Sequence, residues 1–203
     1  NAAQGGGGEL APVTDTFPGC RGVAAAETRA EFEGAWDCEI SGEYGSCTTQ
    51  MSLAADADDI TGMYIIGENS ALSEPGVNHA EDVLADLDFL VVQDLFVNET
   101  AQYADVVLPA CSFVEKTGTF TNTDRTVQKV NQVMEPKGDS RPDWRILQDL
   151  ARRLGREWEY GSTAEIMEED NSLTPLYGGV SHERVESEGG LQRPCPHEDH
   201  PGT

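Results

Sequence analysis

The sequence lacks the features that would mark a metal cluster, a disulfide framework or a membrane protein. Its five cysteines include no C-x2-C pair, which excludes a ferredoxin-like cluster or a zinc ribbon in this chain. An odd number of irregularly spaced cysteines favours unpaired thiols in a reducing compartment. No apolar run is long enough to span a bilayer. We therefore predict a cytoplasmic protein without direct membrane insertion.

Basic residues are also scarce. Lysine and arginine together number 13 against 37 aspartates and glutamates, which gives a formal net charge of −24. A field of this sign opposes nonspecific binding to nucleic acid and to anionic membranes. Such a composition keeps a protein hydrated at high salt, so we predict a salt-adapted protein. The alternative is disorder, but aliphatic runs at 63–66, 89–92 and 106–108 argue against it for the middle of the chain.

The runs at 89–92 and 106–108 are short and bounded by polar residues, which is typical of buried strands, and the run at 89–92 is expected to be buried on both faces. The run at 63–66 is a third strand-like segment. In chain order, apolar residues at helical spacing lie between the first two, at 78–87, and Asn98-Glu99-Thr100 caps a short helix between the last two. The order is β-α-β-α-β with parallel crossovers. This pattern predicts an α/β three-layer sandwich with a mainly parallel sheet, whose ligand binds at the carboxyl edge of the strands.

Polar residues collect at that edge. Gly67 allows close backbone approach after the first strand, Asn69 offers an amide, and Asp94 offers a carboxylate that could accept two hydrogen bonds from a guanine edge. The alternative for each residue is an ordinary strand-end turn or helix cap.

Other segments predict the surrounding structure. The Gly- and Pro-rich residues 1–22 indicate an extended loop, and 23–39 a helix broken by Gly34 that covers the sheet together with a second helix at 46–55. A hairpin is expected over 119–133, a helix over 144–154 with Asp143 as its cap or first residue, and an acidic helix over 163–170. Residues 171–203 indicate a loop-rich tail.

Several motifs resemble one family. GENS at 67–70, QDLFVNETAQYADVVLPA at 93–110, EKTGTFTNTDRTVQ at 115–128, RPDW at 141–144 and the tail GLQRPCPHEDHPGT resemble the third domain of the molybdopterin-guanine-dinucleotide oxidoreductases, most closely the catalytic subunit of formate dehydrogenases. The opening NAAQG is also similar, but the glycines after Gln4 depart from the family pattern, so no pterin contact is assigned there. Because the chain begins with Asn1, we expect an internal fragment.

The resemblance implies a set of cofactor-binding residues: Gly67, Glu68, Asn69, Gln93, Asp94, Lys116 and Asp143. Lys116 would lie near the pyrophosphate, although in so acidic a chain it could simply pair with a neighbouring acid. No catalytic residue and no metal ligand is expected in this chain. Cys195, His197 and His200 have a spacing that resembles metal ligands, but nearby partners are missing.

The resemblance also implies a domain order and a reaction. We predict a loop and covering helices at 1–60, an α/β dinucleotide-binding core at 61–160, and a loop-rich acidic tail at 161–203 that leads to a missing C-terminal domain. The parent would oxidise formate to carbon dioxide, using molybdopterin guanine dinucleotide with Mo or W.

The electrons would pass to iron–sulfur clusters, with a [4Fe-4S] cluster expected in the missing N-terminal part, and then to possible electron-transfer subunits. The fragment alone should be inactive. Two alternatives are an assimilatory nitrate reductase and a noncatalytic relay subunit of a respiratory NADH dehydrogenase.

Overall fold

A computed structural model describes residues 14–74 and 77–203. The glycine-rich residues 1–13, with Asn1 and Gln4, lie outside the described part. The chain divides into two compact units that interleave in sequence. Within the described residues, unit 1 contains 14–45, 117–131 and 159–203, and unit 2 contains 46–74, 77–116 and 132–158.

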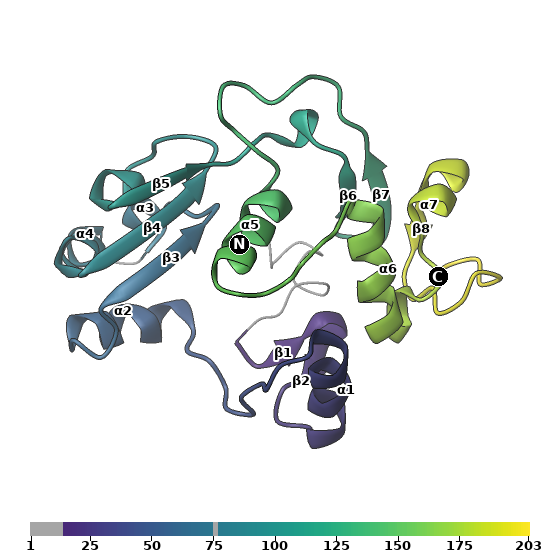
Figure 1. The fold of residues 1–203 in the computed structure, drawn as a ribbon, viewed down its shortest axis with the longest axis horizontal. Coiled ribbons are helices and arrows are strands. Elements are labelled where there is room, and N and C mark those ends of the chain that lie inside the picture. Colours follow the sequence, from purple (N-terminus) through teal and green to yellow (C-terminus); the bar gives the residue numbers. More distant parts are fainter. Residues whose placement is uncertain (1–13, 75–76) are drawn as a thin grey trace. The chain divides into compact units, whose positions relative to one another are not determined.

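Unit 2 is built on a parallel sheet of three strands, β3 (Gly62–Ile66), β4 (Phe89–Asp94) and β5 (Val106–Pro109), in the order β3-β4-β5. Helix α4 (Val77–Asp86) connects β3 to β4, and a single 3-10 turn, η4 (Thr100–Tyr103), connects β4 to β5 (Figure 1). The predicted α/β class and the β-α-β-α-β order are therefore confirmed.

One face of this sheet forms the core of unit 2. Leu90 and Val92 of β4 have no exposed surface, and they pack with Leu84 of α4 and with Ala71 of the short helix α3 (Ser70–Ser73). Alternate residues of a strand point to opposite faces, so Phe89 and Gln93 lie on the other one.

The opposite face is much less covered. Phe89 is 52% exposed, so the prediction of a strand buried on both faces over 89–92 was wrong for this residue. Val106 of β5 is 39% exposed. The prediction of a buried strand at 106–108 was wrong, because β5 is an edge strand that pairs only with β4 among the described residues. Gln93 is the exception on this face. It is fully buried and bonds to α5 (Asp143–Arg153), the helix that approaches the carboxyl end of the sheet.

Two other helices of the predicted set appear close to their expected bounds. Helix α2 (Thr48–Asp56) corresponds to the helix expected at 46–55, and it contacts α4 within unit 2. Helix α5 begins at Asp143 and its C-cap is Leu154, so the helix expected over 144–154 is confirmed. A 3-10 turn, η5 (Phe113–Glu115), follows β5.

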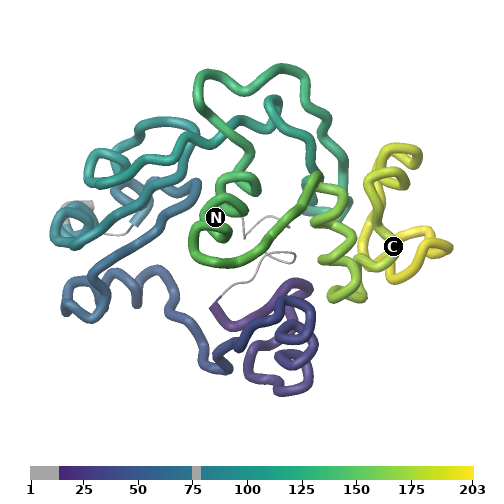
Figure 2. Tube along the Cα trace, viewed as in Figure 1, coloured from purple at the N-terminus to yellow at the C-terminus, as the bar shows by residue number. Residues whose placement is uncertain are grey.

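Unit 1 contains an antiparallel sheet of β6 (Gly118–Thr121), β7 (Thr126–Val130) and β8 (Leu191–Gln192). The predicted hairpin over 119–133 is thus confirmed, and β8, from a much later part of the chain (Figure 2), pairs with β7. Helices α6 (Thr163–Leu173) and α7 (His182–Glu188) and the turn η6 (Pro175–Tyr177) complete this part.

The tail is more ordered than the sequence suggested. Residues of 171–203 supply most of a buried cluster that consists of Val127, Met167, Tyr177, Val180, Val185, Leu191 and Cys195. Much of the tail is loop, as expected, but the sequence did not predict this core, because its apolar residues are spaced too widely for a helix or strand signal. The domain boundaries predicted at 60 and 160 stay a prediction.

The described beginning of the chain is a short hairpin, β1 (Thr16–Phe17), η3 (Pro18–Cys20) and β2 (Arg21–Gly22), followed by α1 (Ala26–Trp36). Phe32 of α1 stacks on Phe17 with ring centroids 4.4 Å apart. Helix α1 is continuous through Gly34, where a Cβ would meet no atom within 4 Å. The predicted break was wrong, because a solvent-facing glycine costs a helix only about 1 kcal/mol.

We also expected α1 to cover the parallel sheet. Its buried residue Phe32 packs against Phe17 and Val23 within unit 1, and the expectation about the sheet, which belongs to unit 2, stays a prediction. None of the helices in the described ranges combines the length and the apolar character that a bilayer span requires.

Candidate functional site

The carboxyl ends of β3 and β4 meet at one edge of the parallel sheet. The Gly67 N–H donates to the Gln93 carbonyl at 2.9 Å, which closes the turn after β3 onto β4. Gly67 has a φ of +63°, and a Cβ there would meet nothing within 4 Å. Glycine is therefore favoured by the left-handed backbone of this turn, and the open space leaves room for close approach of another group.

Asn69 ties the two strand-end loops together. Its Nδ2 donates to Glu99 Oε2 at 2.7 Å, and its Oδ1 accepts from the N–H and the hydroxyl of Thr100 at 3.2 and 2.9 Å. Thr100 is fully buried, and its Oγ1 also accepts from the Ala71 N–H at 3.0 Å. The hydrogen bond from Asn69 lowers the pKa of the Glu99 carboxyl. Asn69 thus has a structural role in this loop pair.

Glu68 precedes Asn69 in the loop after β3. Its Oε1 accepts a hydrogen bond from the Ser73 hydroxyl at 2.5 Å, across α3. The carboxylate is half-buried in unit 2. This hydrogen bond ties Glu68 to the helix that follows it.

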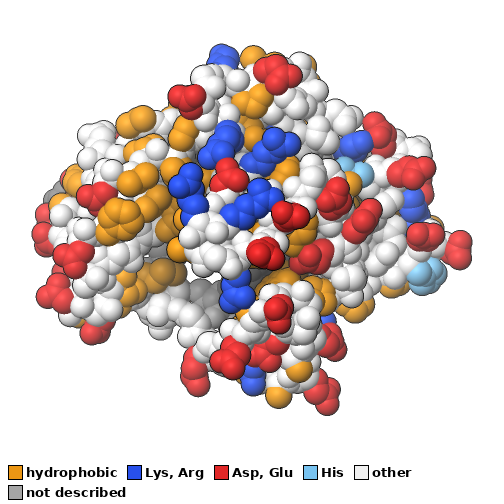
Figure 3. All heavy atoms as spheres, in the orientation of Figure 1, with side chains coloured by type: hydrophobic (Ala, Val, Ile, Leu, Met, Phe, Trp, Pro, Cys, Tyr) orange, Lys and Arg blue, Asp and Glu red, His pale blue; other side chains and the backbone are white. Residues whose placement is uncertain are grey.

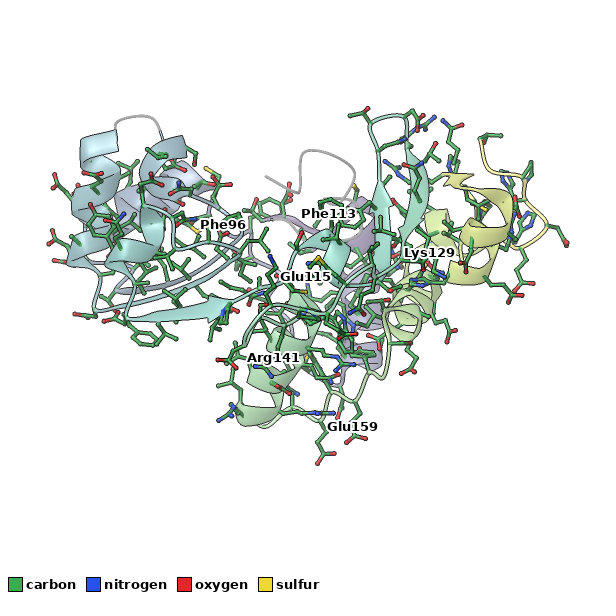
Figure 4. The ribbon with its side chains drawn as sticks, turned by 90° about the horizontal axis from the view of Figure 1, so that it is seen from above. Phe96, Phe113, Glu115, Lys129, Arg141 and Glu159 are labelled. Atoms are coloured by element: carbon green, nitrogen blue, oxygen red, sulfur yellow. The ribbon has the colours of Figure 1, made fainter. Side chains whose placement is uncertain are left out.

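Asp94 organises the turn after β4. Its Oδ1 accepts from the N–H groups of Leu95 and Phe96 at 2.5 and 3.3 Å, and its Oδ2 accepts from Asn98 Nδ2 at 2.9 Å. A carboxylate offers about four acceptor positions, so three are occupied here and about one is left for a ligand. The turn presents three consecutive apolar side chains to solvent, and Phe96 among them is 76% exposed (Figure 4).

A second group of predicted residues forms one hydrogen-bonded chain. Gln93 Nε2 donates to Asp143 Oδ1 at 2.8 Å, and the Tyr64 hydroxyl donates to Gln93 Oε1. Lys116 Nζ forms an ion pair with Asp143 Oδ2. The structure thereby joins Gln93, Lys116 and Asp143, which come from β4, the segment after η5, and the start of α5.

The residues of this hydrogen-bonded series differ in exposure. The Gln93 side chain has no exposed surface, while the side chains of Lys116 and Asp143 are 24% and 34% exposed. A ligand can therefore reach the ion pair. Gln93 holds Asp143 from the buried side. Asp143 does not cap α5, because Pro142 occupies the cap position and the carboxylate is directed to Gln93 and Lys116. Lys116 does pair with a neighbouring acid, as one interpretation expected, and its contact with the pyrophosphate stays a prediction.

A cavity of about 530 Å³ opens at the carboxyl end of β5, in the same unit. It is lined by Leu108, Pro109, residues 138–141 and Ile146 of α5. The lining segment 138–141 is held to β5 because the Arg141 N–H donates to the Pro109 carbonyl at 3.1 Å. Arg141, seen in Figure 4, pairs with Asp149 at 2.6 Å.

Basic side chains are concentrated near this helix. In Figure 3, acidic side chains are spread over the visible face, while lysines and arginines gather over α5. Arg145, Arg152 and Arg153 of α5 are exposed. The helix is therefore locally basic in a chain whose net charge is −24.

The sequence did not reveal Tyr64, Asn98, Glu99 or Thr100 as parts of this edge. Glu99 and Thr100 were assigned only to a helix cap, and Tyr64 only to a strand. A single tyrosine in the aliphatic run Met63–Ile66 was the available signal, because a phenol in a half-buried strand needs a polar partner. Burial, and then the charge of Asp143, raise the pKa of the Tyr64 hydroxyl.

The cysteine and histidines of the tail lie in unit 1. Cys195 is buried, and its Sγ accepts from Arg184 Nη1 at 3.4 Å. The rings of His197 and His200 are 5.4 Å apart. Across the described ranges, no three His, Cys, Asp or Glu side chains are grouped so that they could hold a metal ion. All five cysteines are free thiols, as predicted.

A comparison with known proteins identifies the family of the chain. Residues 12–153 match the family description "Molybdopterin oxidoreductase". The chain belongs to the molybdopterin oxidoreductase family. This confirms the resemblance that the GENS, NET, EKTGTF and RPDW motifs carry, and it implies a molybdopterin cofactor for the parent protein.

Relatives from two bacteria are each named "putative formate dehydrogenase". The chain is 43% identical to one from Staphylococcus haemolyticus over 189 residues, covering 93% of this chain and 19% of the relative. It is 43% identical to one from Bacillus subtilis over 178 residues, covering 88% of this chain and 18% of the relative. The chain thus spans about a fifth of the length of these relatives.

A solved structure has the same fold. Acetylene hydratase from Pelobacter acetylenicus superposes with a TM-score of 0.60 at 20% identity, covering 81% of this chain and 23% of that one. At this identity the likeness concerns the fold alone.

Proposed function

We propose that this chain binds the guanine dinucleotide arm of a molybdopterin cofactor within an enzyme that oxidises formate to carbon dioxide. The observation that carries the proposal is the partly exposed ion pair of Lys116 and Asp143 at the carboxyl end of the sheet, supported by buried Gln93. Ligands of open parallel sheets bind at this edge.

The residues of the edge fit a dinucleotide. Lys116 offers three N–H donors, and its ion pair with Asp143 leaves about two of them for phosphate oxygens. Asp143 uses one acceptor position on each oxygen and keeps about two for the N–H groups of a guanine edge. Asp94 keeps about one acceptor position, so it takes part as a weaker second acceptor.

The other predicted residues have supporting roles. Gly67 leaves open space at the turn, Asn69 fixes the loops after β3 and β4 against each other, and Glu68 holds α3. Gln93 acts through Asp143, since its own side chain is buried. The site therefore consists of a pair of charged contacts held by a scaffold of neutral hydrogen bonds.

Formate is the substrate that the names of the 43% identical relatives favour over nitrate or a noncatalytic relay role. The bound cofactor, with Mo or W, supplies the two-electron chemistry. The residues described here bind and orient it. Catalytic residues and a [4Fe-4S] cluster belong to other parts of the parent, which passes electrons to partner subunits. We place the parent in the cytoplasm, in keeping with five unpaired thiols.

The experiment uses Lys116→Met in the full-length parent. Guanosine monophosphate released by acid hydrolysis measures cofactor content, and reduction of a viologen dye measures formate oxidation. We expect about a tenfold loss of retained nucleotide together with a matching loss of activity.

The matched control is Lys129→Met, which removes a lysine of unit 1 that pairs with Glu186 at 2.6 Å. It should leave both measurements unchanged. Full nucleotide content in Lys116→Met would contradict the proposed contact, and an active enzyme that reduces nitrate instead of oxidising formate would contradict the substrate.

A further inference from the structure

The buried amide of Gln93 lies between two different partners. Tyr64 of β3 is hydrogen-bonded to its oxygen, and Asp143 of α5 accepts from its nitrogen at 2.8 Å. The side chain has no exposed surface, so neither atom has water as an alternative partner. Such an amide is costly to leave unsatisfied.

The direction of this chain of hydrogen bonds follows from charge. Asp143 is ion-paired with Lys116, and a carboxylate in an ion pair can only accept hydrogen bonds. Gln93 must then present its NH2 group to Asp143, which leaves its oxygen for Tyr64. The Tyr64 hydroxyl must donate. Each partner thus has one permitted role.

We propose that Tyr64 is a positioning residue of the cofactor site, whose hydroxyl holds Gln93 and thereby fixes the direction of the Asp143 carboxylate toward guanine. The inference rests on the proposed function, and it adds a residue of β3 that does not itself contact the ligand.

Removal of the Tyr64 hydroxyl would leave the Gln93 amide free to rotate. The Gln93 oxygen would lose its donor, and an amide that turned over would place its oxygen against the Asp143 carboxylate, which is repulsive. Lys116 cannot replace the lost restraint, because its long side chain and rotating ammonium do not fix the plane of a carboxylate. Burial raises the pKa of the Tyr64 hydroxyl, which keeps it protonated and able to donate.

The test uses the full-length parent, produced in cells that make no molybdopterin, and titrates it with GDP and with ADP by calorimetry. The guanine–diphosphate half of the cofactor is then represented by GDP, and ADP reports binding that is not specific for the base. We expect Tyr64→Phe to weaken GDP binding about fivefold and to leave ADP binding unchanged.

Two further variants make the result specific. Tyr103→Phe removes a hydroxyl from another tyrosine of unit 2, which packs against the sheet core, and should not change GDP binding. Gln93→Met removes the amide that links Tyr64 to Asp143, and this substitution alone should weaken GDP binding. In the Gln93→Met background, Tyr64→Phe should cause no further loss, because the two residues act through one chain.

The outcomes separate the two proposals. A parent that does not prefer GDP over ADP overturns the proposed function. A parent that prefers GDP, with Tyr64→Phe binding it equally well, overturns the positioning role. The same loss from Tyr64→Phe in both backgrounds also overturns it, since the hydroxyl would then act without Gln93. If circular dichroism shows that Tyr64→Phe does not fold, Gln93→Met decides alone. Unchanged GDP binding by Gln93→Met then overturns the positioning role, because it acts through Gln93.

Discussion

Gln93 Nε2 donates to Asp143 Oδ1 at 2.8 Å, joining residues 50 positions apart in the sequence. The bond links the carboxyl end of the central strand to the first residue of α5. It explains why a glutamine is fully buried at the carboxyl end of this strand, because the amide has a polar partner there. It also places Asp143 where its carboxylate meets Lys116.

Asp94→Asn should reduce cofactor content in the full-length parent. An amide keeps one acceptor oxygen for the turn, but its NH2 group would face the donating Nδ2 of Asn98. We expect a mismatch of about 1–3 kcal/mol, seen as a loss of guanosine monophosphate after acid hydrolysis while iron content stays normal.

The double variant Asp94→Asn with Asn98→Asp decides how Asp94 acts. It restores a donor and an acceptor within the turn but leaves an amide at position 94. We expect nucleotide content to stay low, because a ligand still meets the amide. Recovery to the wild-type level would assign Asp94 to the turn alone.

Asn69→Ala should loosen the loops after β3 and β4. The substitution removes a bond to Glu99 and the acceptor of the buried Thr100 hydroxyl. Losing these is expected to cost about 1–2 kcal/mol, so backbone amides of 67–73 should exchange hydrogen about tenfold faster by mass spectrometry. Asn131→Ala, which removes a 3.5 Å contact to Glu186 in unit 1, serves as the control and should leave these amides unchanged.

Asp170→Asn should stabilise the chain above pH 6. Burial, with a smaller effect of the Glu169 charge, raises the pKa of Asp170 from 3.8 to about 6. A carboxyl whose pKa is raised in the folded state favours folding when protonated, so its contribution is present below pH 4 and is lost as the pH rises through 6.

The uncharged variant avoids that loss, and the difference in unfolding free energy should grow to at most ~3 kcal/mol by pH 7. Urea unfolding at pH 4 to 8 in constant salt measures it, with the exposed Glu198→Gln as control. A difference that does not change with pH would show that Asp170 is not a buried acid.

The chain should melt at a higher temperature in concentrated salt. Repulsion within a net charge of −24 is screened as ionic strength rises. We expect the melting temperature to rise by roughly 10 °C between 0.1 and 2 M potassium chloride. Betaine at matched osmolality has no net charge and should have a smaller effect. Equal melting temperatures across the salt series would contradict salt adaptation.

The sequence alone determined the parallel core. Runs of β-branched and aliphatic residues at 63–66, 89–92 and 106–108 are too short for helices, and the periodic segment 78–87 between the first two can only return the chain to the same edge. Local signals of this kind do not depend on distant contacts. The motifs around Asn69, Asp94, Lys116 and Asp143 likewise indicated the family without any geometry.

Only the tertiary structure decided which of these residues act together. Asn69 and Asp94 satisfy neighbouring loop groups, whereas Gln93, Lys116 and Asp143 share one hydrogen-bonded chain with Tyr64. A sequence gives each side chain its donors and acceptors but not its partners. Partners are set by packing between segments far apart in the chain, and the same packing folds β8 onto β7 in the tail that local patterns had assigned to a loop.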